Sequence, residues 1–339
     1  MNHRSDTSGD NAISGVPTNI ITGFLGSGKT TAILQLLKHK PRDERWAILV
    51  NEFGEIGVDG GLFQGQHPET TGVYIREVPG GCMCCAAGLP MQIALNQLLG
   101  KARPDRLLIE PTGLGHPVEI LQTLSSVHYS SVLDLQQTVT LVDARKLADV
   151  RYTSNKTFNQ QIAIADVIVG NKRDLYRAAD ETALIAYARR QAAASARVVF
   201  AEHGLISPEN LRGKTASSAK QEHHHPAGKT PTTTGDEPIP EVGYIKAINT
   251  GEGFQSIGWR FSPDQLFDRN RLFAVLSGIS AERLKGVFMT REGVFGYNLT
   301  ADALTEIPLD DCAESRVEII AVEIDDSWEK DILASRVTP

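Results

Sequence analysis

The chain has 339 residues, which is long enough for two domains, and its 41% hydrophobic and 22% charged residues are typical of globular proteins. Its net charge of −7 gives no basic footprint, so we expect no nucleic-acid partner. Residues 1–15 lack an apolar signal core, and no run of about 18 apolar residues follows, so we expect a cytoplasmic protein without membrane contact, whose thiols stay reduced.

The first two thirds of the chain alternate between short apolar segments and segments with helical periodicity. Residues 1–16 are polar and predict a disordered tail, and residues 17–210 predict one domain. Near-continuous apolar strands alternating with helices indicate a mostly parallel sheet flanked by helices on both faces. The expected strands are 19–24, 46–53, 74–78, 106–111, 138–144 and 166–172, and the clearest helices are 30–40 and 90–100.

The composition changes after this domain. Residues 211–238 are rich in Lys, Thr, Ser, Gly and Pro, which predicts a flexible linker that contains His223, His224 and His225. A short His tract can concentrate metal loosely, or it can have no role. Residues 239–339 predict a smaller α+β domain with an antiparallel sheet. Its expected strands are 240–249, 253–261, 272–279, 283–290, 293–299 and 315–324.

Residues 23–30 match the phosphate-binding pattern G-x-x-x-x-G-K-[ST] in full, between an expected strand and an expected helix. Glycines let backbone N–H groups surround an anion, and the helix N-terminus adds partial positive charge. Lys29 can reach the β and γ phosphates as a catalytic cation, and the Thr30 hydroxyl can bind Mg²⁺. A chance glycine-rich turn is the alternative. The predicted nucleotide-binding residues here are Gly23, Gly26, Ser27, Gly28, Lys29, Thr30 and Thr31.

A second loop predicts which base is bound. Asn171, Lys172 and Asp174 form an N-K-x-D sequence at the end of an expected strand. The Asp174 carboxylate can accept hydrogen bonds from guanine N1–H and the exocyclic amine, and adenine has no matching pair of donors. The tetrapeptide alone is a common surface sequence, but together with the phosphate loop it predicts GTP rather than ATP.

Acidic residues follow two of the strands. Glu110 lies at the end of the expected strand 106–111, where it can hold a Mg²⁺-bound water or orient the attacking water, and the Gly113 N–H can sense the γ-phosphate. A helix-capping acid is the alternative reading of Glu110. Glu52, Glu55 and Asp59 lie in a glycine-rich stretch that is the candidate switch region and can supply metal ligands, Glu55 in particular, or can be ordinary surface acids.

Three of the four cysteines lie within four residues, at Cys82, Cys84 and Cys85. Thiolates so close in sequence can converge on one soft cation at about 2.3 Å, and zinc suits them better than Mg²⁺ does. The fourth position is left open, which suits transfer of the metal. A redox pair or buried small side chains are the alternatives. His116 can be the fourth ligand or can cap a turn, and Cys312 is expected to be inert.

Together these motifs resemble the CobW-like branch of the metallochaperone family of P-loop GTPases. The resemblance rests on GFLGSGKTT (23–31), NEFGEIGVD (51–59), GGCMCC (80–85), IEPTGLGHP (109–117), NKRD (171–174), GWRF (258–261) and RLKGVF (283–288). It implies a SIMIBI-type P-loop domain, a CobW-like C-terminal domain, GTP hydrolysis with Mg²⁺, and zinc at the CxCC segment. Some relatives have an acidic residue immediately before the Asn that begins the 51–59 segment. This chain has Val50 at that position, so a zinc site that uses such an acid is not expected here.

We therefore expect a zinc-binding GTPase that uses GTP and GDP to control zinc transfer to a metalloenzyme client. A homo-oligomer is compatible with this interpretation. Two alternatives stay open: a zinc reservoir or sensor with little hydrolysis, and a cobalt chaperone for cobalamin synthesis.

Overall fold

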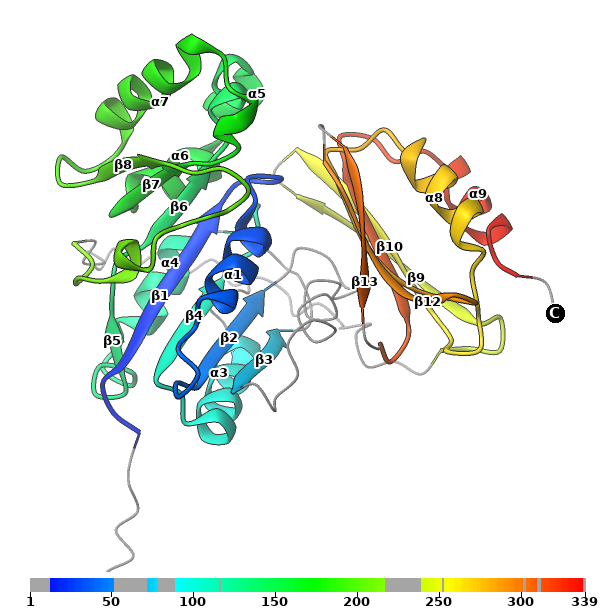
Figure 1. The fold of residues 1–339 in the computed structure, drawn as a ribbon, viewed down its shortest axis with the longest axis horizontal. Coiled ribbons are helices and arrows are strands. Elements are labelled where there is room, and N and C mark those ends of the chain that lie inside the picture. Colours follow the sequence, from blue (N-terminus) through cyan, green and yellow to red (C-terminus); the bar gives the residue numbers. More distant parts are fainter. Residues whose placement is uncertain are drawn as a thin grey trace, which may run out of the picture.

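The structure, a computed structural model, describes residues 13–51, 72–78, 89–115, 117–216, 239–251, 253–300, 303–309 and 312–337. Within these ranges the chain forms two sheets, the first within residues 16–200 and the second within residues 244–321 (Figure 1). No helix in the described ranges is long and apolar enough to cross a membrane.

The first sheet has the strand order β3-β2-β4-β1-β6-β7-β8, with β5 also paired to β1, and every pairing is parallel. Its central strands β4, β6 and β7 are buried nearly throughout, as expected when helices cover both faces of a parallel sheet. The predicted mostly parallel sheet is therefore confirmed. The strands are β1 Val16–Gly23, β2 Trp46–Asn51, β3 Val73–Val78, β4 Arg106–Glu110, β5 Leu133–Leu135, β6 Val139–Val142, β7 Val167–Gly170 and β8 Arg197–Phe200.

Helices lie on both faces of this sheet (Figure 1). Apolar side chains of α1 pack into one buried cluster, and those of α3 and α4 pack into another on strands of the same sheet. The α-helices are α1 Lys29–Lys38, α3 Leu89–Ala102, α4 Pro117–Leu124, α5 Val150–Thr153, α6 Lys156–Ala163 and α7 Ala178–Gln191. The 3₁₀ helices are η2 Ala144–Ala148, η3 Arg173–Leu175 and η4 Pro208–Leu211.

The packed part of the first domain extends to Ala216, beyond the expected boundary at residue 210. Leu211 is buried, and its carbonyl accepts a hydrogen bond from Asn19 Nδ2 at 2.8 Å. The Ala216 N–H donates to Asp166 Oδ1 at 2.8 Å. Composition gave no sign of this order, because the segment is held mainly by hydrogen bonds to the first sheet rather than by buried apolar side chains.

The second sheet is antiparallel, with the order β13-β12-β11-β14-β10-β9. Helices α8 and α9 cover its face away from the first domain (Figure 1), over a core that includes Trp259, Phe261 and Phe288. The elements are β9 Tyr244–Gly251, β10 Phe254–Phe261, α8 Arg269–Ser277, β11 Arg283–Thr290, β12 Gly293–Leu299, β13 Leu304–Leu309, β14 Ser315–Ala321 and α9 Ser327–Ala334.

One expected strand is wrong. Most of residues 272–279 lie in α8, whose N-cap Asp268 accepts from the Arg271 N–H at 2.9 Å. Leu272 and Leu276 are fully buried, and their spacing of four residues places both on one helical face. A short apolar run does not distinguish a strand from a buried helix, and here the N-cap and the spacing decide for the helix.

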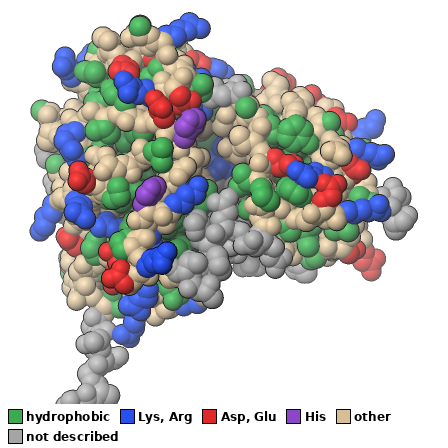
Figure 2. All heavy atoms as spheres, viewed as in Figure 1, with side chains coloured by type: hydrophobic (Ala, Val, Ile, Leu, Met, Phe, Trp, Pro, Cys, Tyr) green, Lys and Arg blue, Asp and Glu red, His purple; other side chains and the backbone are tan. Residues whose placement is uncertain are grey.

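The two domains meet at the phosphate loop. Phe24 and Leu25 pack in one buried cluster with Phe254 and Ile320 of the second domain. At the edge of this contact, Glu282 accepts from Arg151 Nη1 at 3.0 Å and from the Tyr152 hydroxyl at 3.2 Å. Burial, with a further contribution from the Glu282 charge, raises the pKa of Tyr152. On the face shown in Figure 2, basic and acidic side chains are interspersed over both domains.

Candidate nucleotide site

The phosphate loop joins the end of β1 to the start of α1, as its motif predicts. Gly26 and Gly28 have positive φ angles of 67° and 96°, a backbone region that glycine adopts readily. A Cβ on Gly28 would lie 2.4 Å from Asn171 Nδ2, so glycine is also needed here for space. The Ser27 side chain is buried, and its Oγ has no hydrogen-bond partner among the described residues.

Lys29 lies inside this loop. It is 6% exposed, and its Nζ donates to the carbonyl oxygens of Gly23 at 2.9 Å and Phe24 at 3.4 Å. The loop's own carbonyls therefore hold the ammonium beside the concave face that a phosphate would fill. The lysine stem is flexible, so Nζ can leave these carbonyls for the oxygen of a bound phosphate.

Thr30 and Glu110 form the acidic side of the site. The Thr30 hydroxyl donates to Glu110 Oε1 at 2.8 Å, and Glu110 ends β4 with only 2% of its surface exposed. A hydroxyl and a carboxylate are hard oxygen donors, the kind Mg²⁺ prefers. A cationic side chain, Lys285 Nζ, already lies 2.7 Å from the Thr30 oxygen. The position thus accepts positive charge, and the residues present fit a magnesium ion.

Asn171 connects the phosphate loop to the loop at residues 203–204. Its Nδ2 donates to the Ser27 carbonyl at 2.9 Å, and its Oδ1 accepts from the Gly204 N–H at 3.1 Å. Asn171 is 2% exposed, so its amide forms a buried bracket, meaning a pair of hydrogen bonds that holds these two loops together. Gly204 approaches α1 so closely that a Cβ there would lie 2.8 Å from the Ala32 nitrogen.

Lys172 and Asp174 follow at the mouth of the site. Lys172 has a positive φ of 61°, and its Nζ lies 3.8 Å from Asp143 Oδ2. Asp174 is exposed in η3, where its carboxylate faces solvent and can reach a ligand.

Gly113 lies against the phosphate loop. A Cβ on Gly113 would come within 3.0 Å of the Leu25 nitrogen, and the Gly113 carbonyl accepts from Gln161 Nε2 at 3.0 Å. The loop after β4 is thereby held against residues 24–25. Its proposed role in sensing the terminal phosphate stays a prediction.

These segments border one cavity of about 460 Å³. It brings together the phosphate loop, the 171–175 loop and a loop at 203–204, and it also includes side chains of the second domain. The lining residues are Gly26, Gly28, Lys29, Thr30, Thr31, Asn171, Lys172, Asp174, Leu175, His203, Gly204, Arg283, Lys285, Asn298, Thr300, Ala303 and Thr305.

The sequence analysis missed the part of this cavity that comes from late in the chain. Arg283 and Lys285 lie on β11, in a segment that was expected only to be a strand. Two basic residues at i and i+2 in an otherwise apolar strand were the available signal, because they share one face of the sheet. The 203–204 loop was also missed, although Gly204 marked a turn.

The expected zinc site lies outside the described residues, as do Glu52, Glu55, Asp59, His116 and the His223–His225 tract. Those cysteines are Cys82, Cys84 and Cys85. In the ranges that the structure covers, no three His, Cys, Asp or Glu side chains gather to hold a metal ion. Cys312 is half-buried and packs beside Ala247, Val287 and Leu309.

Known proteins are similar to this chain in sequence, and a solved structure aligns with it. The chain is 41% identical over 313 residues to the zinc chaperone YeiR of Escherichia coli (strain K12), covering 90% of this chain and 92% of that protein. It is 29% identical over 237 residues to the zinc chaperone CobW of Sinorhizobium sp, covering 62% and 67% respectively. A crystal structure of the Zn(II)-bound YjiA GTPase from E. coli aligns at a TM-score of 0.43 and 20% identity, covering 96% of this chain and 100% of that chain.

The family model described as CobW/HypB/UreG, nucleotide-binding domain, matches residues 17–200. These residues contain β1 to β8, the phosphate loop, Glu110 and the Asn171–Asp174 loop. The chain therefore belongs to the CobW/HypB/UreG family.

Proposed function

We propose that this protein is a zinc-binding GTPase of the metallochaperone type, which hydrolyses GTP to GDP and phosphate to control zinc binding and transfer to a client protein. The observation that carries the proposal is the convergence of the phosphate loop and the Asn171–Asp174 loop on one cavity. The 41% identical relative is named a zinc chaperone, which supports the choice of metal.

In this proposal the phosphate loop binds the triphosphate and Asp174 recognises guanine. Lys29 leaves the carbonyls of Gly23 and Phe24 for the β and γ phosphates, where its charge offsets that of the transition state. Thr30 would hold Mg²⁺, and Glu110, hydrogen-bonded to it, would hold a metal-bound water or orient the attacking water. When bound, Mg²⁺ supplies charge neutralisation at the β and γ phosphate oxygens.

Zinc is the cargo, and the CxCC segment of Cys82, Cys84 and Cys85 is the proposed carrier. Reduced thiolates are soft ligands, and three of them leave one tetrahedral position for a client's ligand. Coupling between nucleotide and zinc is reciprocal: if GTP changes zinc affinity, zinc changes GTP affinity by the same factor.

Zinc affinity measured by competition with a chromophoric chelator, with GDP and with the β,γ-imido analogue of GTP, tests this coupling. We expect affinities that differ between the two nucleotides, and a variant with all three cysteines changed to serine should lose one equivalent of zinc. Cys312→Ser is the matched control and should bind zinc as the unaltered protein does. Equal zinc affinity in both nucleotide states would contradict the chaperone cycle and leave a reservoir or sensor. A preference for Co²⁺ over Zn²⁺ in anaerobic titrations would favour the cobalt alternative.

A further inference from the structure

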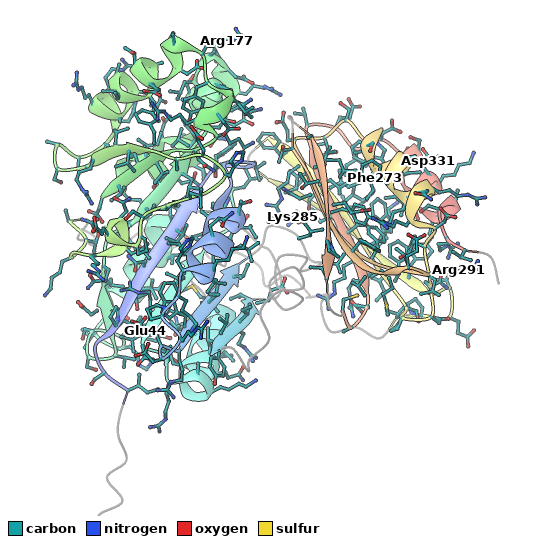
Figure 3. All side chains as sticks on the ribbon, in the orientation of Figure 1. Glu44, Arg177, Phe273, Lys285, Arg291 and Asp331 are labelled. Carbon is teal, nitrogen blue, oxygen red and sulfur yellow. The ribbon has the colours of Figure 1, made fainter. Side chains whose placement is uncertain are left out.

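A lysine of the second domain reaches the centre of the phosphate site. Lys285 lies on β11, on the face of the second sheet that looks towards the first domain (Figure 3). Its side chain is 6% exposed, and its Nζ donates to Thr30 Oγ1 at 2.7 Å across 255 residues of sequence. Thr30 in turn donates to Glu110 Oε1, so the ammonium, the hydroxyl and the carboxylate form one chain of hydrogen bonds.

The contacts around β11 hold this lysine in place. Immediately before the strand, Glu282 is bound by Arg151 and Tyr152 of the first domain. Farther along the same interface, Phe254 packs against Phe24 of the phosphate loop. These contacts hold the second sheet, and with it the backbone of Lys285, against the first domain.

Magnesium and Lys285 cannot both use the Thr30 oxygen in the observed geometry. Mg²⁺ binds oxygen at about 2.0–2.1 Å, closer than the 2.7 Å that now separates Nζ from the hydroxyl. Two cations that share one small oxygen would repel strongly in a buried site. The ammonium must therefore leave Thr30 when the metal binds. A metal held by the Thr30 hydroxyl would supply positive charge to the phosphates of a bound nucleotide, and those phosphates would be within reach of Lys285, which lines the same cavity as the phosphate loop.

We propose that Lys285 is a phosphate-binding residue of the nucleotide site, supplied by the second domain, which moves from Thr30 to the terminal phosphate of GTP. This inference rests on the proposed GTPase function. GDP lacks the terminal phosphate, so Lys285 makes its full contact only in the GTP state. The second domain then senses which nucleotide is bound through its own strand, in addition to any change at the switch region.

Nucleotide affinity of the full chain, measured with fluorescent GDP and competition by the β,γ-imido analogue of GTP in saturating Mg²⁺, tests the inference. A hydrogen bond to a charged phosphate corresponds to about tenfold or more in affinity. We expect Lys285→Met to lower the affinity for the GTP analogue by at least that factor and the affinity for GDP by much less. Lys285→Arg keeps the charge and should retain most of the preference for the GTP analogue. Lys330→Met, at an exposed lysine on α9, is the matched control and should change neither affinity.

Each other outcome overturns the inference. If Lys285→Met lowers the affinity for both nucleotides equally, or changes neither affinity, Lys285 does not contact the terminal phosphate. Tighter binding of both in Lys285→Met, with half-saturation at lower Mg²⁺, would show a lysine that only competes with the metal. If circular dichroism shows that Lys285→Met does not fold, Lys285→Gln and Lys285→Arg are compared instead. We then expect Lys285→Gln to lose affinity for the GTP analogue and Lys285→Arg to keep it. Failure of the unaltered protein to bind either nucleotide would overturn the GTPase function itself.

Discussion

The rings of Phe24 and Phe254 pack edge to face, with centroids 6.2 Å apart and an interplanar angle of 62°. Phe24 occupies a position that the phosphate-loop motif leaves unspecified, and Phe254 begins β10 of the second domain. The loop that we propose binds phosphate is thus also part of the domain interface. A change in its conformation on nucleotide binding would be transmitted directly to the second sheet.

Replacing Phe254 by alanine should loosen this interface. The ring is 5% exposed, and removing a buried phenylalanine costs about 3–5 kcal/mol. In scanning calorimetry we expect the variant to unfold at a lower temperature, with the second domain separating from the first. Phe273→Ala, at a residue 41% exposed on α8, is the control and should cost much less. Equal losses for the two variants would contradict an interface role for Phe254.

Alanine variants of Asn171 and Asp174 should have different effects, the first on stability and the second on recognition of the base. Asn171→Ala removes the amide that bonds to the Ser27 carbonyl and the Gly204 N–H, so two buried hydrogen bonds are lost. The free energy of unfolding, measured with urea, should fall by about 2 kcal/mol or more. Asp174→Ala alters an exposed side chain and should leave stability within about 0.5 kcal/mol.

The same Asp174 variant should weaken GTP binding by more than about 100-fold, because two charge-assisted hydrogen bonds to guanine are lost. Unchanged GTP affinity in Asp174→Ala would show that the base is recognised elsewhere. Unchanged stability in Asn171→Ala would show that the bracket does not support the loops.

Gly204 combines a left-handed backbone conformation, which glycine adopts readily, with a close contact to α1. Its φ is 73°, and a Cβ would meet the Ala32 nitrogen at 2.8 Å. Gly204→Ala should cost about 3 kcal/mol from the left-handed conformation and the clash together. Gly15→Ala has a similar φ of 64° with no atom within 4 Å, so it should cost about 1–2 kcal/mol. Chemical unfolding of the two variants isolates the clash, and equal costs would mean that α1 moves to accommodate the methyl group.

Thr30→Ala should raise the Mg²⁺ concentration needed for nucleotide binding. The variant removes the hydroxyl that is hydrogen-bonded to Glu110 and that would bind the metal. We expect the Mg²⁺ titration of fluorescent GDP binding to shift by about tenfold or more, with a smaller change in EDTA. Thr123→Ala, which removes a helix hydroxyl bonded to the Glu119 carbonyl on α4, should not shift the curve. A Thr30 variant with an unshifted curve would place the metal elsewhere.

The sequence by itself determined the elements whose chemistry is local. The alternation of apolar strands and helices predicted the parallel sheet, and the phosphate-loop pattern required glycines at Gly23 and Gly28, where the backbone adopts positive φ. The family was also visible in the spacing of these motifs. Such features are readable because a short segment encodes its own backbone geometry through residue type and order.

Only the tertiary structure decided which distant segments share the site. It placed Lys285 against Thr30, used Phe24 as an interface residue and made Asn171 a buried bracket to Gly204. It also made most of residues 272–279 helical and ordered the chain to Ala216. These outcomes depend on how two sheets pack and which faces they bury, and no local pattern specifies the partner across such a separation.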